Sequence, residues 1–161
     1  MAVAVGDKVP DVEVKVLGED GMPASVSSAE VLGTGKVVLF AVPGAFTPGC
    51  SKQHLPGFVQ GADALAGKGV DKVVCIAVND AWTLDAWADV QGAKGKIDML
   101  ADGNGAFAAA MGLSFDGAGF GLGTRSQRYA AVIEDGTITK LEVEPGPGVN
   151  ASSCENILAA L

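Results

Sequence analysis

The chain has 161 residues, of which 48% are hydrophobic and 19% charged. A domain spans roughly 100–200 residues, so one domain over residues 1–161 is expected, and the chain is too apolar to be disordered. Eleven Lys and Arg against nineteen Asp and Glu give a net charge of −8, which argues against nucleic acid or an anionic membrane as a partner. One His and three Cys without a CxxC motif exclude a disulfide framework and a multi-histidine metal site.

The chain carries no recognisable targeting or membrane segment. Residues 1–7 lack a basic region, and their apolar run is too short for a signal peptide. No apolar run approaches the ~20 residues that a membrane helix needs. We therefore expect a soluble cytoplasmic protein, and a processed organellar protein would have the same features.

The apolar patterns and turn residues predict alternating strands and helices. In chain order we expect a half-exposed strand over 9–17, a short helix from 27 ended by glycines at 33–35, a buried strand over 37–42, a helix over 51–66, a buried strand over 72–78, a helix over 81–90, a strand over 97–100, a short helix over 104–111, a hairpin over 129–133 and 137–143, and a terminal helix over 152–161. The two buried runs are typical of parallel strands joined by a helical crossover. The order predicts an α/β fold with three layers around a central mixed β-sheet.

The segment over residues 42–54 reads VPGAFTPGCSKQH and is the most informative part of the chain. It follows a buried strand and opens a helix, where α/β sheets hold ligands. Its prolines and glycines set a tight backbone path that delivers Cys50 to the first turn of the helix. Unpaired N–H groups and the positive end of the helix dipole favour a thiolate there. Thr47 offers a hydroxyl to a substrate oxygen or to the sulfur.

Both residues also have a purely structural interpretation. Free cysteine is among the most buried residue types, so an inert core thiol is the alternative for Cys50. A local helix cap is the alternative for Thr47. The Pro and Gly frame favours the reactive thiol.

From Pro43 to Cys50 the chain resembles the active-site pattern of the peroxiredoxins: Pro, three residues, Thr or Ser, two residues and the peroxidatic Cys. The continuation SKQHLPGF is similar to the type II branch, which is atypical two-cysteine and plant-like. The resemblance continues over essentially the whole chain, in the segments VNDA at 78–81, LAD at 100–102, GTRSQRY at 123–129 and VEP at 143–145.

The resemblance implies a thioredoxin-like sandwich that reduces hydrogen peroxide and organic hydroperoxides, in antioxidant defence and redox homeostasis. It implies no metal, haem or flavin cofactor. Thioredoxin, glutaredoxin or glutathione would supply the reducing equivalents, and a homodimer is expected.

By the resemblance, Cys50 is the peroxidatic cysteine, Thr47 and Pro43 shape its pocket, and Arg128 is the active-site arginine. The Cys50 thiolate would attack one peroxide oxygen and become a sulfenic acid as hydroxide or alkoxide leaves. Donors from Thr47, the Cys50 N–H and Arg128 would stabilise the moving charge.

Further residues are expected around the pocket. Gly49, Phe46 and Phe120 are predicted to line it, with a dimer interface or core packing as alternatives for the two phenylalanines. Phe120 belongs to a glycine-rich stretch over residues 116–123, which we interpret as a mobile loop beside the active site.

Arg125 and Arg128 are the only arginines. Positions 125 and 128 face opposite sides of a regular strand, so at most one is expected to point into a site. The resemblance selects Arg128. A solvated charge pair is the alternative for both.

His54 lies four residues after Cys50, on the same helical face. This spacing permits a second class of enzyme, a Cys–His hydrolase or acyl-transfer enzyme in which Cys50 and His54 form the pair. A structural or supporting role for His54 is favoured, because its side chain would lie one turn further into the helix. Pro56 removes an N–H from this helix, so a kink is expected there. A third class is a non-catalytic redox-signalling module.

Two cysteines compete to resolve a sulfenic acid at Cys50. Cys75 lies in a core-strand run, where an inert apolar filler is the interpretation from the residues alone. The resemblance implies a resolving cysteine about here in plant-like members and one near the carboxyl terminus in animal-like members. That second position falls nearer Ala151 than Cys154, so we favour an intramolecular Cys50–Cys75 disulfide.

Overall fold

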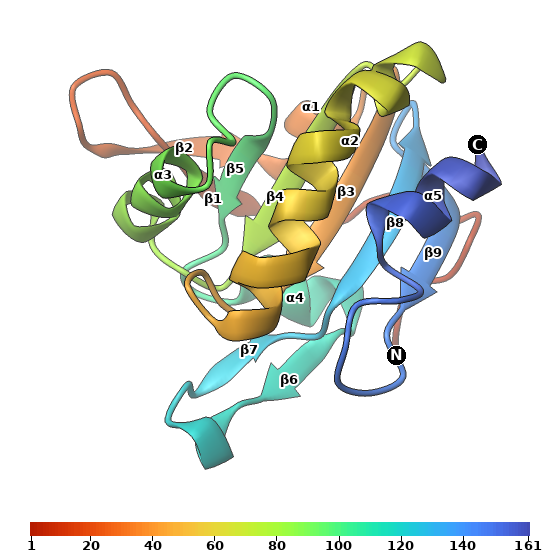
Figure 1. Cartoon of the computed structure of the whole chain (residues 1–161). Coiled ribbons are helices and arrows are strands. Elements are labelled where there is room, and N and C mark those ends of the chain that lie inside the picture. The colour runs from red at the N-terminus through yellow and green to blue at the C-terminus, as the bar shows by residue number, and fades with distance from the viewer.

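A computed structural model describes residues 1–161 as a seven-stranded sheet in the order β2-β1-β5-β4-β3-β8-β9, with a separate two-stranded sheet, β6-β7 (Figure 1). The strands are β1 (Glu13–Leu17), β2 (Pro23–Ser27), β3 (Lys36–Val42), β4 (Lys72–Ala77), β5 (Asp98–Ala101), β6 (Ser114–Asp116), β7 (Thr124–Ser126), β8 (Tyr129–Glu134) and β9 (Thr137–Val143). The helices are α1 (Ser28–Leu32), the π-helix η1 (Cys50–His54), α2 (Leu55–Gly67), α3 (Ala81–Val90), α4 (Ala106–Met111), the 3₁₀ helix η2 (Ala118–Phe120) and α5 (Cys154–Ala160).

The sheet is mixed, as the sequence predicted. Strands β3, β4 and β5 are parallel, with Phe40 of β3 opposite Cys75 of β4 and Cys75 opposite Met99 of β5. Strand β8 runs antiparallel to β3 and pairs with β9 in the predicted hairpin. Its turn places Asp135 and Gly136 at positive φ, of 49° and 81°, as a type I′ turn requires.

Two hydrophobic layers explain why the central strands are apolar throughout. Val38, Phe40 and Val42 of β3 pack in one cluster, against side chains of α2, α3 and α5. The alternate residues Leu39 and Ala41 pack in a second cluster, with side chains of α1 and α4. Successive side chains of a strand point to opposite faces, so both faces of β3 are buried. The molecule therefore has the three-layer thioredoxin-like arrangement that was predicted (Figure 1).

The amino-terminal strand is shorter than predicted. It begins at Glu13, because residues 10–12 bind the start of α1 instead of a neighbouring strand: the Ser28 hydroxyl donates to the Pro10 carbonyl at 2.6 Å and accepts from the Val12 N–H at 2.9 Å. Pro10 also lacks the N–H that a strand ladder uses.

The glycine-rich stretch, predicted as a loop, connects two short strands. Strands β6 and β7 pair around it and η2 forms its tip, so the segment projects from the body of the molecule as a small hairpin (Figure 1). Neither these two strands nor β2 was predicted.

The predicted crossover helix begins with a π turn. The Leu55 N–H donates to the Cys50 carbonyl, five residues back, and ordinary α-helix follows from Leu55. Pro56 supplies no N–H to the Lys52 carbonyl, and the wider turn lies directly before it. Single π turns inside helices occur frequently at functional sites. None of the helices is both long and apolar enough to cross a bilayer.

Candidate active site

Cys50 lies at the start of η1, eight residues after the end of β3, and its side chain is fully buried. Arg128 comes to it from the residues before β8, and its Nη2 donates a hydrogen bond to the Cys50 Sγ at 3.2 Å. A guanidinium keeps its charge at any relevant pH. The sulfur therefore faces a permanent cation, which suits a thiolate better than a neutral thiol.

The loop between β3 and Cys50 is held by its own hydroxyl and by a neighbouring strand. The Thr47 hydroxyl donates to the Gly44 carbonyl at 2.6 Å, and the Thr47 N–H reaches the same oxygen at 3.3 Å. Asn79, after β4, accepts from the Ala45 N–H through its side-chain oxygen at 2.9 Å. Phe46, which lies between Ala45 and Thr47 in the chain, has φ +65°, which is strained for a bulky residue. The contacts on both sides of Phe46 hold the loop in this strained form.

Both arginines reach this loop, which differs from the prediction that at most one would. Arg125 donates to the Leu122 carbonyl at 2.9 Å and lies 3.5 Å from the Pro43 carbonyl. The prediction assumed one regular strand through both arginines, but the strand is interrupted: β7 ends at Ser126 and β8 begins at Tyr129. Residues 127 and 128 lie outside both strands, so the alternation of sides does not carry through.

Two glycines make room for these guanidinium groups. A Cβ at Gly44 would lie 3.1 Å from Nη1 of Arg125, and a Cβ at Gly49 would lie 3.1 Å from Nη2 of Arg128. Most real Cβ contacts are wider than this. The absence of side chains at these positions therefore sets how closely the cations approach the loop.

His54 does not pair with Cys50. Its Nδ1 lies 3.0 Å from Nη1 of Arg128, and its Nε2 lies 2.9 Å from the Ser152 carbonyl. The ring is buried against Phe40 and Phe58, with centroid distances of 5.0 and 5.6 Å. Burial, reinforced by the charge of Arg128, lowers the pKa of His54 to about 3. Both nitrogens of a neutral imidazole are thus occupied, and the geometry does not favour the Cys–His alternative.

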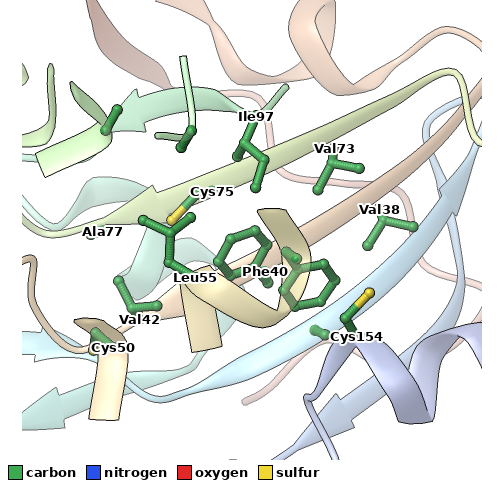
Figure 2. Close-up of a cluster of buried hydrophobic side chains, with 14 of the residues drawn as sticks. Val38, Phe40, Val42, Cys50, Leu55, Val73, Cys75, Ala77, Ile97 and Cys154 are labelled. Carbon is green, nitrogen blue, oxygen red and sulfur yellow. The ribbon is translucent and has the colours of Figure 1, made fainter. Parts of the chain in front are cut away.

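Cys75 lies on β4 in the same hydrophobic cluster as Cys50. Figure 2 shows Leu55 between the two cysteines in this view, over the sheet. Burial raises the pKa of the Cys75 thiol well above its usual range, and the charge of Cys50 adds to the effect. Cys75 is therefore an unreactive thiol in the present conformation.

Cys154 lies at the other end of that cluster, on α5 (Figure 2). Its sulfur fills the space that Gly61 of α2 leaves, since a Cβ at Gly61 would collide with it. Burial raises the pKa of this thiol to about 11. All three cysteines are free.

The three residues expected to line a pocket differ in exposure. Gly49 is half-buried beside Arg128, Phe46 is 52% exposed, and Phe120 is 80% exposed at the tip of the β6–β7 hairpin. A cavity of about 380 Å³ lies elsewhere, between α3, β5 and β1, and none of the site residues lines it. No group of three or more His, Cys, Asp or Glu side chains is placed to hold a metal ion.

Sequence reasoning missed two polar side chains that shape the site. Asn79 was noted only as part of a resemblance, and Ser51 was not singled out, although its hydroxyl accepts from the Trp87 indole N–H at 2.9 Å. The signal for Asn79 was its place after a buried parallel strand, at the same sheet edge as Cys50. For Ser51 no sequence signal existed, because its partner lies 36 residues away.

A buried thiol that begins a helix at the end of a parallel strand, facing an arginine, defines a thiol-based redox site on a thioredoxin-like fold. The family described as Redoxin matches residues 4–158. Peroxiredoxin-2E, chloroplastic, of Arabidopsis thaliana is 42% identical over 163 residues, covering 99% of this chain and 70% of that protein. Peroxiredoxin-2B of the same plant is 40% identical over 159 residues, covering 99% of this chain and 98% of that protein.

Among solved structures, reduced Prx3 from Vibrio vulnificus in complex with hydrogen peroxide superposes with a TM-score of 0.93 at 46% identity, covering 98% of each chain. The chain belongs to the Redoxin family and, within it, to the type II peroxiredoxins. It is a thiol-dependent peroxidase.

Proposed function

We propose that Cys50 is the peroxidatic cysteine and that Arg128 is the cation that activates it. The observation that carries this is the 3.2 Å hydrogen bond from Nη2 of Arg128 to the Cys50 Sγ, at the start of a helix. The solved relative with bound hydrogen peroxide, at 46% identity, supports the same small substrate here, and organic hydroperoxides are the larger substrates proposed.

In the proposed reaction the Cys50 thiolate attacks one peroxide oxygen and the O–O bond breaks. The second oxygen leaves as hydroxide or alkoxide and takes up a proton, and the sulfur becomes a sulfenic acid. Arg128 and the Cys50 N–H would donate to the oxygens as negative charge moves from sulfur to the leaving oxygen. The Thr47 hydroxyl already donates to Gly44, so its remaining lone pairs would accept a hydrogen bond from the O–H group of the peroxide.

The pocket around this reaction is proposed to comprise Pro43 and Gly49 near the sulfur, with Phe46 and Phe120 at its exposed rim. Cys50 is fully covered, so the chain around it must open slightly to admit the substrate. The exposed rings of Phe46 and Phe120 would favour an alkyl group over water.

We propose that Cys75 resolves the sulfenic acid. Its thiol would attack Cys50 and release water, leaving a disulfide. A disulfide requires Cα atoms within about 7 Å, so η1 must unwind and carry Leu55 aside. All three cysteines belong to one buried cluster, but Cys154 of α5 packs against α2 at the far end of that cluster from Cys50 (Figure 2), which favours the pairing with Cys75.

Thioredoxin, glutaredoxin or glutathione would then reduce the disulfide. A homodimer is proposed, with exposed Phe46 and Phe120 as apolar contacts, and light scattering would measure its mass.

We propose the cytosol as the compartment. Because two similar plant proteins are named as chloroplastic, a fluorescent fusion in the source organism is the direct check.

Intact mass after one equivalent of hydrogen peroxide tests these assignments. Wild type is expected to lose two hydrogens, and Cys154→Ser to do the same. Cys75→Ser is expected to gain one oxygen, and Cys50→Ser to remain unchanged. Oxidation of Cys50→Ser would overturn the peroxidatic assignment, and a disulfide that persists in Cys75→Ser would overturn the resolving assignment.

A further inference from the structure

The loop after β9 is folded around one carboxylate. Glu144 accepts hydrogen bonds from the backbone N–H groups of Asn150, Ala151 and Ser152 at 2.9, 3.3 and 2.8 Å. It also accepts from the Ser152 hydroxyl at 2.6 Å. Burial raises the pKa of Glu144, but these hydrogen bonds outweigh it, and the net shift is downward. An ionised carboxylate thus closes the loop over residues 145–152, and it takes no part in the steps of peroxide reduction.

The closed loop presents one backbone oxygen to the active site. The Ser152 side chain is fully buried, and its carbonyl lies 2.9 Å from Nε2 of His54. A carbonyl accepts but cannot donate, so the single proton of the neutral imidazole must sit on Nε2. The Nδ1 atom is then left with a lone pair.

That lone pair faces the cation of the site. Nδ1 of His54 lies 3.0 Å from Nη1 of Arg128, and the other terminal nitrogen of the same guanidinium lies 3.2 Å from the Cys50 Sγ. A guanidinium can only donate, so the contact exists only in the tautomer that the Ser152 carbonyl selects. The opposite tautomer would point an N–H at the guanidinium.

Glu144 also holds the backbone of the same arginine. Its N–H donates to the Arg128 carbonyl at 3.0 Å, continuing the β8–β9 pairing beyond the ends of the two strands. Glu144 therefore contacts Arg128 directly through the main chain and indirectly through the loop and His54. The first route ends at the backbone of Arg128, and only the second, through the carboxylate, reaches the guanidinium on Cys50.

We propose that Glu144 is a positioning residue for peroxide reduction: by closing the 145–152 loop it fixes the Nε2–H tautomer of His54, which in turn orients Arg128 toward the Cys50 sulfur. The inference rests on the proposed role of Arg128. It predicts that a carboxylate that touches neither substrate nor sulfur controls the rate of the first chemical step.

Nitrogen NMR tests the tautomer without any measurement of activity. His54 is the only histidine, so one pair of ring ¹⁵N shifts reports it in the full-length protein. Wild type is expected to show a single Nε2–H form at neutral pH. Glu144→Gln, which places an amide where four donors converge, is expected to show a mixture of tautomers, and Glu144→Ala is expected to show the same.

The rate of Cys50 oxidation is the second measurement. Under rapid mixing with hydrogen peroxide, Glu144→Gln is expected to react about tenfold more slowly than wild type, and to have no further effect in an Arg128→Lys background. The matched control is Asp71→Asn, which removes a carboxylate that accepts the Lys36 N–H at 2.8 Å, where β3 begins. It is expected to leave both tautomer and rate unchanged.

The inference stands only if Glu144→Gln changes the tautomer and lowers the rate together. It is overturned by an unchanged tautomer, by an unchanged rate, or by an equal loss in the Arg128→Lys background. If Arg128→Lys alone reacts like wild type, the proposed role of Arg128 fails, while the NMR spectrum still decides whether Glu144 sets the tautomer.

Discussion

At Gly49 the active-site loop passes so close to Arg128 that any side chain would move the guanidinium. A Cβ there would lie 3.1 Å from the same nitrogen that bonds Cys50. The guanidinium would have to shift by a few tenths of an ångström, which would disturb its hydrogen bond to the sulfur. Glycine is therefore needed at residue 49 because Arg128 must approach the sulfur closely, and not because the backbone makes a turn there.

We expect Gly49→Ala to lower the rate constant for hydrogen peroxide at least tenfold, which corresponds to about 1.4 kcal/mol of transition-state stabilisation. Rapid-mixing fluorescence or competition with a second peroxidase measures it. The fold should persist, because the contact is with the end of a flexible side chain.

Gly67→Ala is the matched control for this prediction. Gly67 is the last residue of α2, and a Cβ there meets no atom within 4 Å. The same substitution should leave the rate unchanged and stabilise the helix slightly. If both variants react like wild type, the approach of Arg128 to the loop does not matter for the reaction.

At the scale of elements, η1 is the part of the molecule that must open for Cys50 to meet Cys75. A hydrogen bond ties it to α3: the fully buried Trp87 donates from its indole nitrogen to the Ser51 hydroxyl at 2.9 Å. Opening η1 leaves this N–H without a partner inside the core, which costs free energy. The bond therefore holds the helix in the form that reacts with peroxide.

We expect Ser51→Ala to accelerate disulfide formation after peroxide addition about fivefold, because a typical hydrogen bond contributes about 1 kcal/mol. Trapping the sulfenic acid with dimedone at timed intervals measures this rate. Trp87→Phe should have the same effect, with an added loss of stability from the space it leaves in the core.

Trp82→Phe controls for the loss of an indole hydrogen bond in general. Trp82 is 51% exposed and donates from its indole to the Gly21 carbonyl, between β1 and β2. The Trp82→Phe variant should form the disulfide at the wild-type rate. An unchanged rate in Ser51→Ala would show that opening of η1 does not depend on the bond to α3.

The elements that could be predicted are those with a strong local signal. The runs at β3 and β4 are apolar because both faces are buried, and α3 begins where Asp80 caps it by accepting the Thr83 N–H at 2.8 Å. Strand β2 reads PASVS and has no fully buried residue, so it has no apolar pattern to detect. Strands β6 and β7 have three residues each, too few for any periodicity.

The candidate site was predicted only as far as one segment and a family resemblance allow. Cys50 and Thr47 share a loop whose prolines and glycines are visible in the sequence. The contacts of His54 with Arg128 and Ser152 span 74 and 98 residues. The spacing of residues along the chain does not predict contacts over such separations. The π turn could not be predicted either, because Pro56 predicts a kink but not that the Leu55 N–H donates to the Cys50 carbonyl.

At the scale of the whole molecule, the sheet brings four distant segments to one end. The loops after β3 and β4, the entry to β8 and the exit from β9 supply Cys50, Asn79, Arg128 and Glu144. Parallel strands end together, and an antiparallel strand begins where they end. The site is therefore assembled only in the folded chain, and its ionisation is coupled to global stability.

The single histidine makes this coupling measurable. The pKa of His54 is about 3 in the folded protein and 6.5 as its ordinary value, so below pH 6.5 the unfolded chain binds a proton that the folded protein excludes. Stability is then fully present above pH 6.5 and is lost as the pH falls toward 3. Between pH 7.5 and 5.0 the loss from this residue alone should be about 2 kcal/mol.

Urea unfolding of wild type and His54→Gln at both pH values isolates this contribution, because every carboxylate titrates alike in the two proteins. Glutamine keeps hydrogen-bonding groups at the site but does not titrate in this range. We expect wild type to lose about 2 kcal/mol more than His54→Gln on going to pH 5.0, although the variant is less stable at pH 7.5. Equal losses in the two proteins would mean that His54 is protonated in the folded state, and an imidazolium 3.0 Å from Arg128 could not hold that guanidinium toward the sulfur.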